Sequence, residues 1–176
     1  MLLSIKEMEV RKLPFAETWE PNGFDFSDPT VTQKGPLRAE GEAELLPDTG
    51  GEVHIKGRIH ADIETECDRC LGRAPFQIDA PIDLYYRPLE STARSHEEET
   101  AIDEGEAEMG FYEMPGLQLE DIIREQVELA LPMQRVCSES CKGICPVCGV
   151  NRNDTTCDCH PKSGDDRWMA LKDFHV

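Results

Sequence analysis

Six cysteines fall within 23 residues of the sequence and are the residues best suited to do chemistry: Cys137, Cys141, Cys145, Cys148, Cys157 and Cys159. Cys145 and Cys148 lie in a C-P-x-C-G turn, a tight loop that lets two thiolates converge on one ion. A structural zinc ion takes four thiolate or imidazole ligands in a tetrahedron, and one C-x-x-C pair supplies half of them. The sequence therefore predicts a structural Zn²⁺ site built from these six cysteines.

The second half of the tetrahedron is open to two interpretations. Cys157 and Cys159 can return to the ion across the loop that follows Cys148, or Cys137 and Cys141 can approach it from the other side. We favour the return of Cys157 and Cys159, because the loop is short and rich in Gly, Asn and Asp residues, which turn easily.

A second C-x-x-C motif, Cys67-Asp-Arg-Cys70, lies between two expected strands. Two thiols cannot complete a zinc tetrahedron, so this pair needs the two tail cysteines left over from the first site, or it binds no metal. One zinc site is expected, and a second is possible with Cys67 and Cys70. The rival interpretation is a thiol oxidoreductase, but a thioredoxin-like motif opens a helix whose N-terminus lowers the thiol pKa, whereas this one ends a strand.

The formal net charge of −18 over 176 residues limits the partners of the chain. An acidic surface repels phosphate backbones and favours basic partners. Direct RNA binding is therefore expected only at a local patch, either the tail residues Lys142, Arg152 and Lys162 or the basic stripe from His54 to His60, whose two histidines are expected to be solvated. The first residues show no secretory signal and no apolar run is long enough to span a bilayer, so we expect a cytoplasmic protein with no membrane partner.

The elements that position these residues follow from the hydrophobic periodicity. Strict alternation of apolar and polar residues predicts three strands, at 37–45, 53–65 and 76–84, and Leu2 to Met8 is a possible fourth, followed by an irregular segment up to the first of the three. An apolar stripe from Leu119 to Leu131, stopped by Pro132, predicts the main helix. A short closing helix is expected between Asp165 and Phe174.

These elements predict an α+β fold: an antiparallel β meander, curled into an open barrel or half-sandwich, packed by one main helix and followed by a small cysteine-rich zinc-binding tail. The residues between the last strand and the helix are dominated by Glu and Asp, as in a solvated linker. The expected division is an antiparallel β domain at 1–89, an acidic linker at 90–110, and the helix with its tail at 111–176.

Three stretches together resemble the YceD family of large ribosomal RNA subunit accumulation proteins: Cys67-Asp-Arg-Cys70, the helix ending in Leu129-Ala-Leu-Pro132, and the cysteine-rich tail. Members commonly carry Asp-Pro-Arg where this chain has Asp165-Asp166-Arg167, and other members lack the tail cysteines. The resemblance implies a role in the synthesis, processing or stability of 23S ribosomal RNA and in large-subunit biogenesis. It brings no catalytic residues.

Three hypotheses follow. The first is a non-enzymatic assembly factor that holds a basic ribosomal protein or an rRNA-processing factor and meets the large-subunit rRNA precursor directly or through that partner. The second is an enzyme, either a thiol oxidoreductase using Cys67 and Cys70 or a zinc hydrolase; an all-thiolate zinc site has no open position, which argues against the hydrolase. The third is a direct RNA-binding zinc module. We favour the first.

Overall fold

The computed structural model describes residues 1–89 and 109–160, which separate into two compact units. The first, here called the sheet unit, comprises Met1–Thr65 and Pro75–Met133. The second, called the cysteine unit, comprises Glu66–Ala74 and the chain from Gln134 onward. In chain order the elements are β1 (Leu2–Ser4), α1 (Ile5–Met8), β2 (Leu13–Trp19), β3 (Thr32–Gln33), β4 (Leu37–Leu45), β5 (Val53–Glu66), β6 (Arg73–Pro88), β7 (Met109–Tyr112), β8 (Gly116–Gln118) and α2 (Leu119–Ala130).

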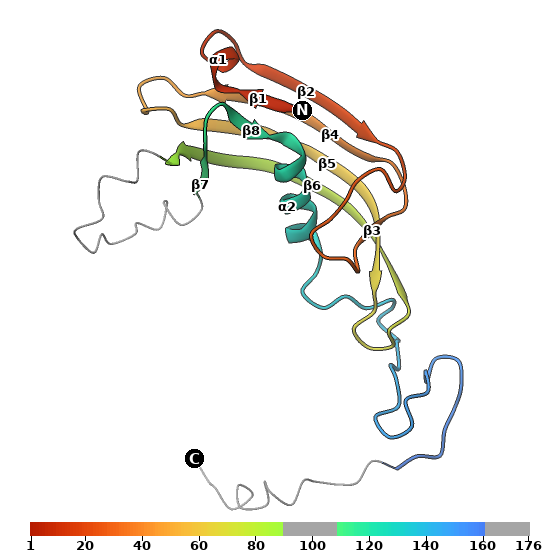
Figure 1. The fold of residues 1–176 in the computed structure, drawn as a ribbon. Coiled ribbons are helices and arrows are strands. Elements are labelled where there is room, and N and C mark those ends of the chain that lie inside the picture. Colours follow the sequence, from red (N-terminus) through yellow and green to blue (C-terminus); the bar gives the residue numbers. More distant parts are fainter. Residues whose placement is uncertain (90–108, 161–176) are drawn as a thin grey trace, which may run out of the picture. The chain divides into compact units, whose positions relative to one another are not determined.

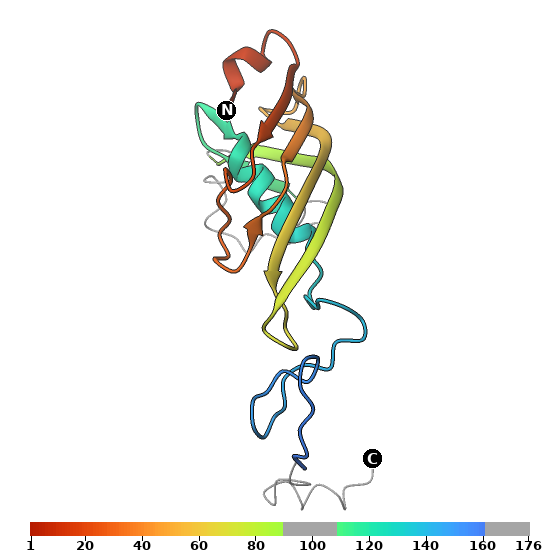
Figure 2. The same cartoon turned by 90° about the vertical axis from the view of Figure 1, so that its right-hand side faces the viewer.

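The main sheet has the strand order β2-β4-β5-β6-β7, and β3 pairs with β5 outside this path. The pairs β2–β4 and β4–β5 are antiparallel, whereas β6 and β7 run parallel. The sheet curves, and α2 lies on its concave face (Figures 1 and 2). A separate two-stranded sheet joins β1 to β8 at the beginning of α2.

The core of the sheet unit lies between α2 and the inner face of the long strands. Alternate residues of β5, such as Ile55, Ile59 and Ile63, are 0–1 % exposed. They share one apolar cluster with Ile123 and Val127 of α2. The faces buried in the structure are thus the ones that the alternation in the strands and the apolar stripe of the helix predict. The α+β fold is confirmed.

Three features of the sheet differ from the sequence-based expectation. The stretch from Leu2 to Met8 is a short strand followed by the single helical turn α1. The segment taken as irregular contains β2, which carries an exposed Pro14 in its interior. This proline is tolerated because β2 lies at the edge of the sheet, where a missing N–H leaves no ladder partner unsatisfied. Finally, the parallel strand β7 makes the sheet mixed instead of a pure antiparallel meander.

Two expected segments lie outside the described residues, namely most of the acidic linker and the closing helix between Asp165 and Phe174. The domain boundaries at 89 and 110 therefore stay a prediction. Among the described residues, no helix has the length and hydropathy needed to cross a membrane.

Candidate metal centres

The Cys67-Asp-Arg-Cys70 motif forms the tight turn between β5 and β6. The Cys67 N–H donates to the carbonyl oxygen of Gly72 at 2.7 Å, and the Leu71 N–H donates back to the Cys67 carbonyl at 2.9 Å. Leu71 has a positive φ of 59°, a conformation uncommon for a branched side chain. The backbone thus folds into a closed knuckle that buries both cysteines.

The first sulfur cluster combines this knuckle with the first two tail cysteines. The Sγ atoms of Cys67, Cys70, Cys137 and Cys141 all lie within 4.8 Å of one another. Two of the separations are 3.9 Å, between Cys67 and Cys141, and 3.7 Å, between Cys70 and Cys137. Zn–S bonds of about 2.3 Å in a tetrahedron place sulfurs about 3.8 Å apart, so these separations have the length that a zinc site requires.

Backbone hydrogen bonds connect the tail to the knuckle within the cysteine unit. The Asp68 N–H donates to the Arg135 carbonyl at 2.8 Å, and the Arg135 N–H donates to the Asp68 carboxylate at 2.6 Å. The Ile144 N–H donates to the Arg69 carbonyl at 2.8 Å. These bonds lie on both sides of Cys137 and Cys141 in the sequence, and so they align the tail with the knuckle in the folded unit.

The second sulfur cluster is formed by Cys145, Cys148, Cys157 and Cys159, whose Sγ atoms also lie within 4.8 Å of one another. Its C-P-x-C-G turn closes through a bond from the Gly149 N–H to the Cys145 carbonyl at 2.9 Å and one from the Cys145 N–H to the Val150 carbonyl at 2.8 Å. Gly149 has a φ of 76°, which favours glycine at this position.

The electrostatics of both clusters favour thiolates at specific positions. Burial raises the pKa of Cys67, but the backbone N–H groups of Cys137, Arg69 and Cys70 outweigh it and lower the pKa to about 6. The backbone N–H groups of Cys148 and Val147 lower the pKa of Cys145 to about 6 as well.

Other thiols in the same clusters are held protonated by their neighbours. The contact with the Cys148 side chain, together with desolvation, raises the pKa of Cys159 to about 12. Sulfurs this close cannot all ionise unless a cation compensates their charge. A bound divalent ion supplies that charge and deprotonates the remaining thiols.

Asn153 connects the loop between Cys148 and Cys157 to the first cluster. Its Nδ2 atom donates to the Cys141 Sγ at 3.4 Å and to the Asn151 Oδ1 at 2.9 Å, while its Oδ1 accepts the Lys142 N–H at 2.8 Å. The hydrogen bond from Asn153 is the first cause of a lowered pKa at Cys141. The sequence pattern predicts no role for Asn153, and the signal that could have indicated one is the pair Asn151 and Asn153 between the cysteines of the second cluster.

The structure therefore places each of the six predicted cysteines in a four-sulfur cluster. Cys157 and Cys159 lie with Cys145 and Cys148, and Cys137 and Cys141 lie with the knuckle cysteines. Both clusters fit Zn²⁺, because four thiols at tetrahedral spacing are its usual structural ligands. That the cysteines bind an ion, and which ion they bind, stays a prediction.

The geometry favours a structural site over thiol exchange at Cys67 and Cys70. Cys67 is 0 % exposed and Cys70 is 8 % exposed, so neither sulfur is open to attack on a disulfide. Two further sulfurs lie beside them, and no helix begins at the motif. Four thiolates would also fill the coordination shell of zinc, which leaves no position for a catalytic water.

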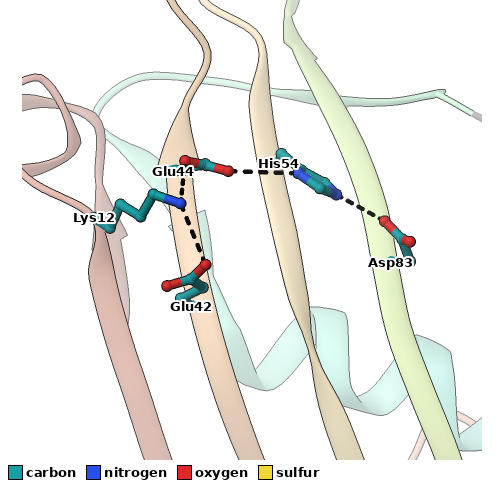
Figure 3. A network of polar contacts seen from close by, with 5 residues as sticks. All are labelled: Lys12, Glu42, Glu44, His54 and Asp83. Atoms are coloured by element: carbon teal, nitrogen blue, oxygen red, sulfur yellow. Dashed lines mark hydrogen bonds and ion pairs between the residues drawn. The ribbon is translucent and has the colours of Figure 1, made fainter.

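The expected basic stripe on β5 proves to be compensated by carboxylates. The expectation that His54 is solvated is wrong: His54 is buried, and its ring stacks on Tyr85 with centroids 4.2 Å apart. Its Nε2 lies 2.7 Å from the Asp83 carboxylate and its Nδ1 lies 3.8 Å from that of Glu44. Figure 3 shows this network, in which Lys12 joins Glu44 at 2.7 Å.

The same compensation continues along β5. The Nε of Arg58 lies 2.5 Å from the Asp79 carboxylate, and the Nδ1 of His60 lies 3.5 Å from it. On the other side, Glu40 and Glu42 of β4 are the cross-strand partners of Arg58 and Lys56. An open depression of about 590 Å³ at this face is lined by both signs of charge, from Arg38 and His60 to Asp62 and Asp79. Carboxylates thus lie among the basic side chains of this face, which weakens its attraction for a phosphate backbone.

The fold and the two clusters describe an α+β protein with a cysteine-rich module of the kind that binds structural metal. The sequence profile described as large ribosomal RNA subunit accumulation protein YceD matches residues 55–175. The chain therefore belongs to the YceD family. The match includes most of β5, the knuckle and both sulfur clusters.

The chain is also similar to several curated proteins. An uncharacterised protein of Mycobacterium tuberculosis is 30 % identical over 120 residues, which cover 68 % of this chain and 54 % of the relative. The chloroplastic YCED homolog 1 of Zea mays, a large ribosomal RNA subunit accumulation protein, is 40 % identical over 42 residues, covering 23 % of this chain and 14 % of the relative. The chain thus spans about half the length of the mycobacterial relative. No solved structure matches the chain.

Proposed function

We propose that this protein is a non-enzymatic factor in the synthesis, processing or stability of 23S ribosomal RNA during biogenesis of the large ribosomal subunit. The family match over residues 55–175 carries the proposal, because that family is described by the accumulation of large-subunit rRNA. In this proposal the protein acts in the cytoplasm by holding a basic ribosomal protein or an rRNA-processing factor.

Zinc has a structural role in this proposal. Cys67, Cys70, Cys137 and Cys141 hold one ion, and Cys145, Cys148, Cys157 and Cys159 hold a second. Each bound ion would add no reactivity of its own, since all of its positions would be taken by thiolates. The ions instead keep the knuckle and the tail folded, as in other small metal-dependent modules.

The distribution of charge supports a protein partner over direct RNA contact. The described part of the cysteine unit has equal numbers of basic and acidic side chains: Arg69, Arg73, Arg135, Lys142 and Arg152 against Glu66, Asp68, Glu139, Asp154 and Asp158. A zinc ion with four thiolates carries a net charge of about −2, so two filled sites make this unit acidic. Lys162, the third cation of the expected tail patch, lies outside the described residues.

The ratio of 23S to 16S ribosomal RNA in cells depleted of the protein tests the proposed function. We expect a selective fall of 23S that the wild-type chain restores. An unchanged ratio with normal subunit profiles would contradict the proposal.

Paired cysteine variants separate the structural role from an oxidoreductase. The structural proposal expects C67S/C70S and C145S/C148S to fail alike in restoring 23S, because each removes half of a metal site. An oxidoreductase that uses Cys67 and Cys70 requires only the first variant to fail. Binding of purified protein to 23S fragments that weakens steeply with added salt would favour the RNA-binding module instead.

A further inference from the structure

A pocket of about 320 Å³ in the sheet unit lies where the ends of β6 and β7 meet β8 and the beginning of α2. Aromatic and acidic side chains dominate its lining, and no lysine or arginine of residues 1–89 and 109–160 contributes to it. The aromatic residues are Tyr86, Phe111 and Tyr112, and the acidic ones are Glu113, Asp121 and Glu125.

The aromatic walls are held by the backbone around them. The Tyr112 hydroxyl donates to the Gly51 carbonyl oxygen at 2.7 Å, which fixes this buried ring. Gly110 is the β7 partner of Tyr86, and a Cβ at Gly110 would overlap the Tyr86 ring. Glycine at this position therefore lets the ring lie against the strand. Phe111, in contrast, is 49 % exposed, so part of its surface is open to a partner.

The acidic side chains of the pocket differ in how far they are compensated. Asp121 accepts a bond from the Arg124 Nη1 at 2.6 Å and is partly neutralised. Glu113 and Glu125 have no ion-pair partner within residues 1–89 and 109–160. Burial and the negative charge of Glu125 together raise the pKa of Tyr86 to about 12, which agrees with a negative potential in the pocket.

We propose that this pocket binds the side chain of a lysine or arginine in a basic protein segment, an inference that rests on the proposed function and names the place where the partner docks. A cation over the face of Phe111 or Tyr86 gains from the ring quadrupole, and Glu113 and Glu125 supply the opposite charge. A neutral apolar group would desolvate those carboxylates without compensation, and an anion would be repelled. Met114, which follows the lining residue Glu113 in the sequence, has an exposed side chain that offers an apolar contact to the same segment.

The test is an NMR titration of the zinc-loaded full chain with a short peptide of alternating lysine and glycine. We expect saturable binding, with the largest amide shifts at Phe111, Gly116 and Ile122, and no binding of the same peptide after acetylation of its lysines. F111L keeps an apolar side chain but removes the aromatic face, and it should weaken binding about two- to fivefold. E125Q should weaken it at least as much.

The matched control is E7Q/E9Q, which removes exposed acidic charge at α1 from two residues that do not line the pocket. If this variant weakens binding as much as E125Q, or if F111L and E125Q bind like the wild type, the attraction is diffuse and the pocket proposal is wrong.

The 23S readout separates this inference from the proposed function. If the peptide binds at the pocket but depleted cells keep their 23S to 16S ratio, the proposed function is wrong and the pocket proposal stands. If 23S falls on depletion but F111L and E125Q bind the peptide as tightly as the wild type, the pocket proposal is wrong and the proposed function stands.

Discussion

Each of the two units of this protein is stabilised internally by a different physical means. The sheet unit contains a continuous apolar cluster in which residues such as Leu37, Ile59 and Ile123 are 0 % exposed. The described part of the cysteine unit buries only the small residues Ala74 and Gly143 and the cysteines Cys67, Cys70, Cys141 and Cys145. Its larger apolar side chains face outward, with Leu71 58 % and Val147 56 % exposed.

We infer from this difference that the sulfur clusters stabilise the cysteine unit in the way that the apolar core stabilises the sheet unit. A small segment without buried Leu, Ile or Phe side chains cannot offset the entropy of ordering its backbone by apolar burial alone. Metal binding can offset it, because the free energy of binding to a preformed site is gained only in the folded state. The two units should therefore respond to different perturbations.

Removal of metal should produce the largest difference between the units. Structural zinc contributes on the order of 10–16 kcal/mol in small zinc-dependent modules, so a strong chelator should unfold the cysteine unit and leave the sheet unit folded. We expect elemental analysis to find two zinc ions per chain before treatment. Amide spectra should then lose the dispersed signals of the cysteine unit, and these should return with added zinc. A cysteine unit that stays dispersed without metal would contradict the comparison.

Truncation in the apolar core should have the opposite selectivity. Ile123 of α2 is 0 % exposed, and I123A leaves a cavity that should lower the free energy of unfolding of the sheet unit by about 2–5 kcal/mol. The zinc content should not change. L129A on the same helix removes a side chain that is 70 % exposed and is the matched control, with an expected effect below about 0.5 kcal/mol. Thermal unfolding with parallel metal analysis measures both. Loss of zinc from I123A at temperatures where the sheet unit is folded would show that the two cores are not independent.

Within the cysteine unit, the bond from Asn153 to Cys141 should raise the metal affinity of the first cluster more than that of the second. N153A removes a hydrogen bond to a ligand sulfur, and losses of such supporting contacts typically cost about 10- to 100-fold in metal affinity. Competition with a chromophoric chelator should show one of two zinc ions released more easily. The neighbouring exposed D154N serves as control and should release both ions as the wild type does. Equal weakening of both sites would indicate a general loss of folding instead.

The sequence could predict the elements whose burial follows a period, because a strand or helix with one buried face repeats its apolar residues in register. Strands β4, β5 and β6 and helix α2 are of this kind. Strand β2 was missed, since Pro14 and the turn residues after Trp19 hide its short alternation. The parallel strand β7 was missed because it follows the acidic segment and has only four residues.

For the candidate site, the sequence could identify the ligands but could not decide their grouping. Spacing in the sequence counts residues and does not describe the path of the chain between them. The knuckle of Cys67 and Cys70 meets Cys137 and Cys141 through the bonds between Asp68 and Arg135, which no periodicity encodes. The burial of His54 escaped prediction for the same reason, since the carboxylates and the Tyr85 ring that cover it belong to neighbouring strands.

The smallest expected effect is at this histidine and depends on pH. The hydrogen bond from His54 holds the pKa of Asp83 below its ordinary value of 3.8, with a further contribution from the positive charge of Lys56. A carboxylate whose pKa is lowered in the folded state adds stability above its unfolded pKa and loses it as the pH falls through the folded value. D83N should therefore lower the melting temperature of the sheet unit slightly at neutral pH. The difference in melting temperature between D83N and the wild type should narrow below about pH 4 and vanish at still lower pH. The control D48N, at an exposed turn, should melt at the same temperature as the wild type at every pH. If the difference for D83N persists unchanged at low pH, packing against His54, and not the carboxylate charge, stabilises this face of the sheet.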